Sequence, residues 1–125
     1  MKPTERGLAH LFLATQYSIR GLQAAWRHEE SFRQEAVLAL MGLPLALWLA
    51  RDMADFLFLT SSLLLLLLAE LGNSAIEAVV DRVSAEHHEL SGRAKDLGSA
   101  MVFMAILIVI VCWSSVLLSI LYLNP

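Results

Sequence analysis

The sequence predicts an all-α membrane protein in which an N-terminal amphipathic surface helix precedes three transmembrane helices, all within one domain over residues 1–125. Hydrophobic residues make up 58% of the 125-residue chain and charged residues only 17%. The mean hydropathy is +0.63, and a soluble domain of this size would leave too much of that apolar surface in water. The apolar residues also gather in three long stretches after residue 31, which indicates three spans.

Residues 7–27 predict the surface helix. Apolar side chains recur there at helical spacing, whereas most of the arginines and glutamines lie on other faces. The segment is not hydrophobic enough to span a bilayer, so we expect it to lie in the membrane interface with its cations near lipid headgroups. The alternative is a helix packed on a soluble core, but the rest of the chain offers no such core. The apolar positions are Leu8, Leu11, Phe12, Ile19, Leu22 and Trp26.

The first transmembrane helix is expected over residues 32–50. Its apolar part, Ala36–Ala50, is only about 22 Å long at a rise of 1.5 Å per residue. It can extend back through Phe32 if Arg33 snorkels toward the membrane surface. Pro44 lies inside this helix and predicts a kink or a local break.

The second and third transmembrane helices are expected over residues 56–83 and 100–123. The apolar part of the third is about 34 Å long, which is enough to cross a bilayer. Five of the lysines and arginines lie before residue 34, one lies in the turn at 51–55, and three lie in an expected loop at 82–96. The positive-inside rule therefore places the N-terminus and the 82–96 loop in the cytoplasm.

The second span carries the strongest functional signal, which we call the polar stripe: Glu70, Asn73, Glu77 and Asp81. At about 100° per residue these four positions fall within an arc of roughly 80° on one helix face. Carboxylates at membrane depth cost several kcal/mol unless they are paired, hydrated or bound to metal. With the orientation above, Asp81 lies at the cytoplasmic mouth and Glu70 lies roughly 10 Å deeper than Glu77.

Two further polar clusters, at residues 29–35 and 86–99, are expected on the same side of the membrane. Together the clusters offer carboxylates for a hard cation such as Mg²⁺, bases for phosphate and a deep carboxylate for proton transfer. Glu70 and Glu77 are too far apart to chelate one ion easily, so we expect Glu77 near a metal and Glu70 against a lipid hydroxyl. No phosphate-binding loop or protein-kinase signature is present, so spacing alone does not name the reaction.

Three other interpretations of the polar stripe were weighed. It could be a helix–helix contact joined by Asn73 and Ser74, although several acids on one buried face make that costly. It could belong to a small proton or ion conduit, but the first and third spans carry no comparable acids to continue a route across the bilayer. A non-enzymatic assembly protein is the third alternative.

The chain resembles the prokaryotic diacylglycerol kinase family in one specific motif, E-x-x-N-[ST]-A-I-E-x-x-x-D, which is residues 70–81 here. The resemblance continues through residues 86–100 and is also clear at 17–26 and 32–35, so it covers roughly the whole chain. Two positions depart from the family pattern: His10 replaces a more usual arginine, and His87 stands where an aromatic residue is expected.

The resemblance implies a homotrimeric helical bundle whose active sites are shared between subunits, in a bacterial inner membrane, multi-pass, with a cytoplasmic N-terminus. It implies ATP-dependent phosphorylation of diacylglycerol to phosphatidic acid at the cytoplasmic interface, with Mg²⁺ as cofactor. The expected partners are ATP and a membrane lipid, and no nucleic acid. Undecaprenol is the alternative acceptor, although Trp26 and Glu35 match the diacylglycerol branch better.

The resemblance also assigns residue roles. Glu70 is the implied catalytic base on the lipid hydroxyl with Asn73 beside it, and Glu29 and Glu77 are the implied metal ligands. The implied nucleotide contacts are Tyr17, Glu29, Glu77, Glu86, His88, Lys95 and Asp96. The implied lipid-substrate contacts are Ala14, Trp26, Ser31, Arg33, Glu35, Glu70 and Ser99.

Overall fold

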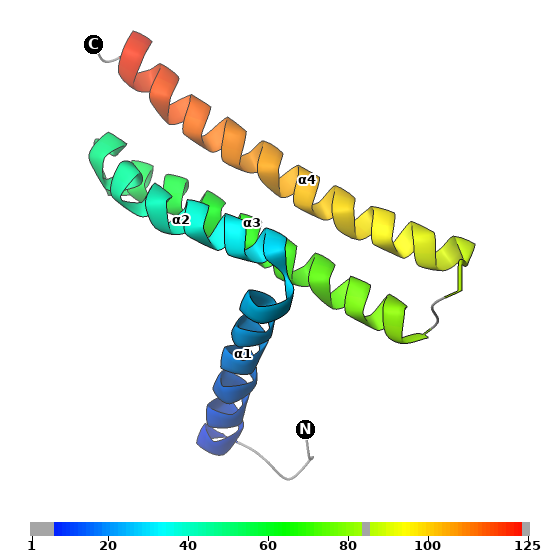
Figure 1. The fold of residues 1–125 in the computed structure, drawn as a ribbon. Helices are drawn as coiled ribbons and strands as arrows, with labels where there is room; N and C mark the ends of the chain where they lie inside the picture. The colour runs from blue at the N-terminus through cyan, green and yellow to red at the C-terminus, as the bar shows by residue number, and fades with distance from the viewer. Residues whose placement is uncertain (1–6, 84–85, 124–125) are drawn as a thin grey trace.

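Helices make up nearly all of the computed structural model, which describes residues 7–83 and 86–123. The order along the chain is α1 (Leu8–His28), α2 (Glu30–Leu49), α3 (Met53–Val83) and α4 (Glu89–Leu118), which continues as a short π-helix, Ser119–Leu123. α3 packs against both α2 and α4, and α1 projects from this bundle at a steep angle (Figure 1). Within the two described ranges there is no strand, so the predicted all-α class is confirmed.

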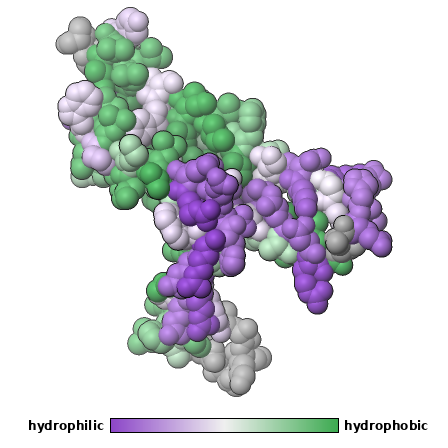
Figure 2. Space-filling view, in the orientation of Figure 1, coloured by the Kyte–Doolittle hydropathy of each residue, from purple (hydrophilic) through white to green (hydrophobic). Residues whose placement is uncertain are grey.

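Three helices are long and apolar enough to cross a membrane: Glu30–Leu49, Met53–Val83 and the continuous helix Glu89–Leu123. Their number confirms the three predicted spans. Figure 2 shows apolar residues covering the end of the bundle that holds the α2–α3 turn, while hydrophilic residues cover much of α1 and the end where α3 connects to α4. This division gives the bundle one end suited to lipid and one suited to water and ligands.

The fourth helix differs most from the sequence prediction. We expected a loop over 82–96 and a span from 100, but α4 already begins at Glu89. The Nδ1 atom of His88 accepts a hydrogen bond from the backbone N–H of Leu90 at 3.0 Å and caps the first turn. Glu89 then pairs with Arg93 one turn later, at 3.4 Å. Capping and this i,i+4 pair extend the helix beyond its apolar part, which is the only part that hydropathy detects.

The lengths of α2 and α3 place the polar stripe. α3 has 31 residues and α2 has 20, so α3 is longer by about 16 Å at 1.5 Å per residue. The two helices share the turn at Arg51, and α2 continues unbroken through Pro44, so the local break considered from the sequence is absent. The last turns of α3, with Glu77 and Asp81, therefore extend past the start of α2, whereas Glu70 remains alongside it.

The buried core within one chain is small. One cluster joins Ala46 of α2, Leu59 of α3 and Val116 of α4. Most outward leucines remain uncovered: Leu40 and Leu64, for example, are 69% and 66% exposed. In water such a surface would be strongly unfavourable, whereas lipid tails or other subunits cover it without that cost.

A polar contact inside the bundle joins α3 and α4. The indole Nε1–H of Trp113 donates to the hydroxyl of Ser62 at 3.1 Å. Ser62 is buried and its hydroxyl donates in turn to the carbonyl oxygen of Leu59 at 2.7 Å. Because no water is available at this depth, the serine oxygen is what satisfies the indole donor.

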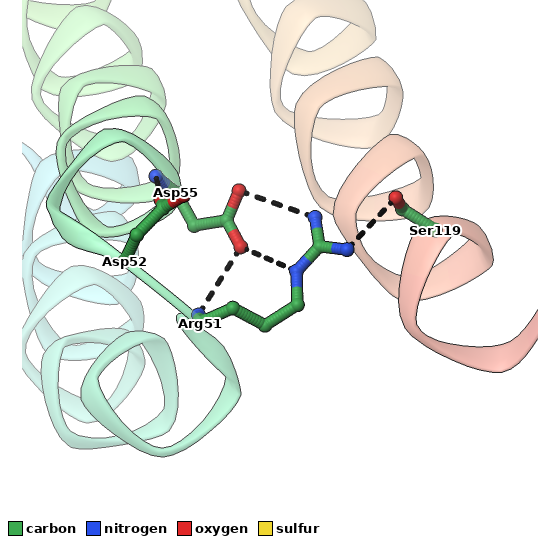
Figure 3. A network of polar contacts seen from close by, with 4 residues as sticks. All are labelled: Arg51, Asp52, Asp55 and Ser119. Carbon is green, nitrogen blue, oxygen red and sulfur yellow. Dashed lines mark hydrogen bonds and ion pairs between the residues drawn. The ribbon is translucent and has the colours of Figure 1, made fainter. Parts of the chain in front are cut away.

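A second polar network holds together the apolar end of the bundle, where α2 turns into α3 (Figure 3). The Nε of Arg51 pairs with an Asp55 carboxylate oxygen at 2.8 Å, and its Nη1 donates to the Ser119 hydroxyl at 3.0 Å. The hydrogen bond that Arg51 donates to the Asp55 carboxylate is the largest factor that raises the pKa of Arg51 above its usual value. The network ties the α2–α3 turn to the end of α4.

The joint between α1 and α2 is fixed by one arginine. The Nη1 of Arg33 donates to the carbonyl oxygens of Trp26 at 2.8 Å and Arg27 at 3.3 Å. Both carbonyls belong to the last turn of α1, where helix geometry leaves them without partners in the helix itself. Glu29 is the single residue between the two helices. The Arg33 contact therefore also fixes the position of the Glu29 backbone.

The Ser62–Trp113 contact gives a stability prediction. Replacing Ser62 with alanine should lower the free energy of unfolding in micelles by about 1 kcal/mol, because the indole N–H loses its acceptor. Steric trapping or denaturant titration measures this. Ser61→Ala is the matched control, since Ser61 is exposed on the same turn. In a Trp113→Phe background Ser62→Ala should cost clearly less; an equal cost in both backgrounds would show that the contact contributes nothing.

Candidate active site

Glu70 is the most buried acidic residue that the structure describes. It lies on α3 with 6% of its surface exposed. The carboxyl group of Glu35 on α2 lies beside that of Glu70, and both line the same cavity. Two ionised carboxylates this close would repel each other, so sharing one proton would stabilise the pair. The arrangement gives Glu70 a neighbour with which it can share a proton at membrane depth.

The two carboxyl groups open into a cavity of about 330 Å³, which we call the Glu70 cavity. Its polar wall comes from α2, α3 and α4, and its residues lie up to 68 positions apart in the sequence. They are Ser31, Glu35, Glu70, Asn73 and Ser99. Its other wall is apolar and belongs to α4, with Val102, Phe103 and Ile106. A cavity with acids at one wall and hydrocarbon at the other suits the polar end of an amphipathic lipid.

Asn73 connects this cavity to the next turn of the polar stripe. Its Nδ2 donates to the Glu77 Oε1 at 3.3 Å. This contact agrees with the predicted placement of both residues on one face of the helix. The Oδ1 of Asn73 and the Oε2 of Glu35 are buried without a hydrogen-bond partner among the described residues. The Glu35 oxygen belongs to a residue that lines the Glu70 cavity, so a ligand there that brings a hydrogen-bond donor would satisfy it.

Glu70 belongs to a group of three carboxylates, those of Glu29, Glu70 and Glu77, which we call the acidic centre. Glu70 experiences the negative charges of both Glu77 and Glu29, and none of the three forms an ion pair with a lysine or arginine in the part of the chain that the structure describes. No group of three or more metal-ligating side chains occurs in that part either. One chain therefore gathers three carboxylates without a lysine or arginine partner among the described residues, and a cation bound there would need further ligands from elsewhere.

A second, polar cavity of about 250 Å³ lies between the end of α3 and the start of α4, and we call it the Lys95 cavity. Lys95 Nζ pairs with Asp81 Oδ1 at 2.7 Å across its wall. Glu86 and His88, predicted as nucleotide contacts, line the same cavity. The structure thus brings together three predicted nucleotide contacts, and Asp81 holds the ammonium group between the two helices.

Several predicted residues lie outside both cavities in a single chain. Ala14, Tyr17 and Trp26 lie on α1, and Tyr17 stacks under Arg20 with its ring centroid 5.8 Å from the guanidinium carbon. Arg33 points back to α1, and Asp96 is exposed on α4. Glu29 lies beside a larger groove of about 690 Å³ between α1 and α3. One chain therefore assembles the acidic centre but leaves the α1 residues apart from it.

Sequence analysis missed the apolar wall of the Glu70 cavity. Val102, Phe103 and Ile106 follow Ser99 at helical spacing, but in a long apolar helix nothing distinguishes such residues from those that face lipid. The only available signal was their register with Ser99. It becomes informative once Ser99 is known to face Glu70.

Comparisons with known proteins identify the family of this chain. The family model described as prokaryotic diacylglycerol kinase matches residues 16–117. The chain is 48% identical to the Escherichia coli K12 protein named diacylglycerol kinase, over 90% of this chain and 93% of that one. It is 48% identical to the Haemophilus influenzae protein of the same name, over 89% and 94%. The Pseudomonas aeruginosa protein of that name is 44% identical, over 91% and 93%.

Proposed function

Because this chain belongs to the prokaryotic diacylglycerol kinase family, we propose that its acidic centre transfers phosphate from ATP to the hydroxyl group of a membrane lipid. The chain is a diacylglycerol kinase, so the acceptor is diacylglycerol and the product is phosphatidic acid. The observation that carries the residue assignment is the burial of Glu70 beside Glu35, in a cavity with one apolar wall.

Glu70 acts as the general base in this proposal. A lipid hydroxyl in the Glu70 cavity donates its hydrogen bond to the Glu70 carboxylate, while Glu35 holds the proton that the pair shares. Glu70 removes the hydroxyl proton as the oxygen attacks the γ-phosphorus of ATP, and ADP leaves. The hydroxyls of Ser31 and Ser99 are placed to bind the other polar oxygens of the lipid, and the α4 wall contacts its hydrocarbon.

Glu29 and Glu77 are the proposed Mg²⁺ ligands. The unpaired negative charge around Glu70 fits this role, since Mg²⁺ usually takes only one or two carboxylates and fills its shell with phosphate and water. Held by these two carboxylates, the ion would supply positive charge that offsets the negative charge of the phosphate groups. Asn73 orients Glu77 by its 3.3 Å hydrogen bond, and Lys95 contacts a phosphate after exchanging its Asp81 partner.

The remaining proposed nucleotide contacts come from α1, the α3–α4 connection and the start of α4. Glu86, His88 and Asp96 surround the nucleotide near Lys95, and Tyr17 reaches it from α1. Ala14, Trp26 and Arg33 extend the lipid site. The α1 residues Ala14, Tyr17 and Trp26 lie outside the two cavities of one chain. This supports an oligomer, which we propose to be a homotrimer, whose active sites combine side chains of two subunits.

The proposed location is a bacterial inner membrane, with the N-terminus and the α3–α4 connection in the cytoplasm. This orientation is supported by three basic residues near that connection, Arg82, Arg93 and Lys95. Two of the basic residues counted at the N-terminus, Lys2 and Arg6, lie outside the described residues. The α1 helix lies in the interface in this arrangement, because its outer side chains, such as Leu11 and Phe12, are more than 60% exposed.

The acceptor and the alternative functions are weighed by the same comparisons. The relatives are named diacylglycerol kinases, which favours diacylglycerol over undecaprenol. The family also disfavours the ion conduit.

Glu70→Gln tests the base. The amide cannot accept the hydroxyl proton, so we expect kcat to fall by about 100- to 10,000-fold while KM for ATP changes little. Lipid phosphorylation in mixed micelles measures both. The control is Glu30→Gln, an exposed acid in the first turn of α2. Near-full activity of Glu70→Gln would remove the base assignment.

Glu29→Gln and Glu77→Gln test the metal ligands. Each change should raise the Mg²⁺ concentration for half-maximal activity by about 10-fold or more, since even outer-shell partners of metal sites contribute that much. Titrating Mg²⁺ at fixed ATP shows the shift. Glu89→Gln is the control, because its side chain is 85% exposed. Unchanged Mg²⁺ dependence in both test variants would argue against the assignment.

Lys95→Met tests the phosphate contact. Losing a charge-assisted hydrogen bond should raise KM for ATP by about 10-fold, with KM for the lipid little changed. Arg93→Met is the matched control two positions away, since Arg93 pairs with Glu89 and does not line the Lys95 cavity. Equal rises of KM for ATP in the two variants would show a general charge effect and not a specific contact.

A further inference from the structure

Gly98 of α4 lies directly against the acidic centre on α3. It is one of the few buried residues in its helix. A β-carbon built at position 98 would overlap the Oδ1 of Asn73, and it would lie 3.4 Å from the Asn73 Cγ and 3.5 Å from the Cδ1 of Ile76. The two helices therefore approach so closely here that the asparagine amide occupies the space of a missing side chain.

Backbone conformation does not explain this glycine. Gly98 lies in the interior of a regular helix, and Gly7 is the only glycine with a positive φ in the described ranges. Alanine is intrinsically favoured over glycine at such a position. What glycine offers here is space, and the group that fills the space is the amide of Asn73.

The amide has one orientation that satisfies its neighbours. Its Nδ2 donates to Glu77 Oε1 at 3.3 Å, and its Oδ1 is buried over Gly98 without a hydrogen-bond partner among the described residues. Turning the amide over would place its oxygen against the Glu77 carboxylate, where two acceptors repel. A β-carbon at position 98 would push the whole amide away from α4 and change its contact with Glu77.

We propose that Gly98 is a positioning residue: by leaving room for Asn73, it lets the amide hold Glu77 in the orientation that binds the metal ion. This inference rests on the proposed role of Glu77 as a Mg²⁺ ligand. Gly98 acts through Asn73 and touches neither the metal nor the substrate. Outer-shell groups that orient a metal ligand commonly contribute about 10- to 100-fold in metal affinity or activity.

Gly98→Ala is the test variant, and Gly72→Ala is its matched control. A β-carbon at position 72 would meet the Cε of Met101 at 2.9 Å, so both changes crowd the same α3–α4 interface. The methionine is flexible and can move aside, whereas Asn73 is held by Glu77. We expect Gly98→Ala to raise the Mg²⁺ concentration for half-maximal activity by about 10-fold, and Gly72→Ala to leave it near the wild-type value.

A thermal measurement without nucleotide separates the contact from the metal role. Gly98→Ala should lower the Tm in micelles, and adding Gly98→Ala to an Asn73→Ala background should not, because the alanine at 73 leaves room for the new methyl group. Non-additivity of this kind marks direct contact. The same Tm loss in both backgrounds, or a wild-type Mg²⁺ dependence in Gly98→Ala, would overturn the proposal.

The two levels of the proposal can fail separately. If Glu77→Gln has a wild-type Mg²⁺ dependence, the metal role of Glu77 is wrong, and with it the consequence drawn for Gly98. The Tm comparison would still decide whether Gly98 and Asn73 are in contact. If Glu77→Gln shifts the Mg²⁺ dependence and Gly98→Ala does not, only the positioning role is wrong.

Discussion

The cost of a carboxyl group at membrane depth is the constraint on which the rest of this structure depends. Glu70 is 6% exposed on a helix whose other faces are made for lipid. An unpaired charge there would cost several kcal/mol. Glu35 lies beside Glu70, so a shared proton can reduce the charge of the pair, and both open to a cavity at the end of the bundle where polar residues gather. Each of these features is also what a proton acceptor for a lipid hydroxyl needs.

Helix length is the means by which the chain joins water to lipid. α3 extends about 16 Å beyond the reach of α2, so a single helix carries Glu70 beside the apolar bundle and Asp81 beside the Lys95 cavity. α4 begins at Glu89 and accompanies this extension. The close approach at Gly98 and the Lys95–Asp81 pair fasten the two helices to each other over the same stretch. The proposed phosphate path thus follows one helix pair.

Much of this arrangement could be predicted from the sequence, because its signals are local. The face shared by Glu70, Asn73 and Glu77 follows from helical periodicity, and three spans follow from hydropathy. The start of α4 could not be predicted in this way, because residues 89–99 are mostly polar and hydropathy does not distinguish a polar helix from a loop. The contact of Gly98 with Asn73 and the apolar wall at Phe103 depend on the register between two helices, which one sequence does not reveal.

The central claim is that the acidic centre passes phosphate from ATP to diacylglycerol. The most direct measurement incubates the purified protein in mixed micelles with Mg²⁺, diacylglycerol and ATP radiolabelled at the γ-phosphate, and then separates the lipids. The account predicts that the label appears in phosphatidic acid and in no lipid when diacylglycerol is omitted. Label found only as free phosphate, or transferred to undecaprenol but not to diacylglycerol, would contradict it.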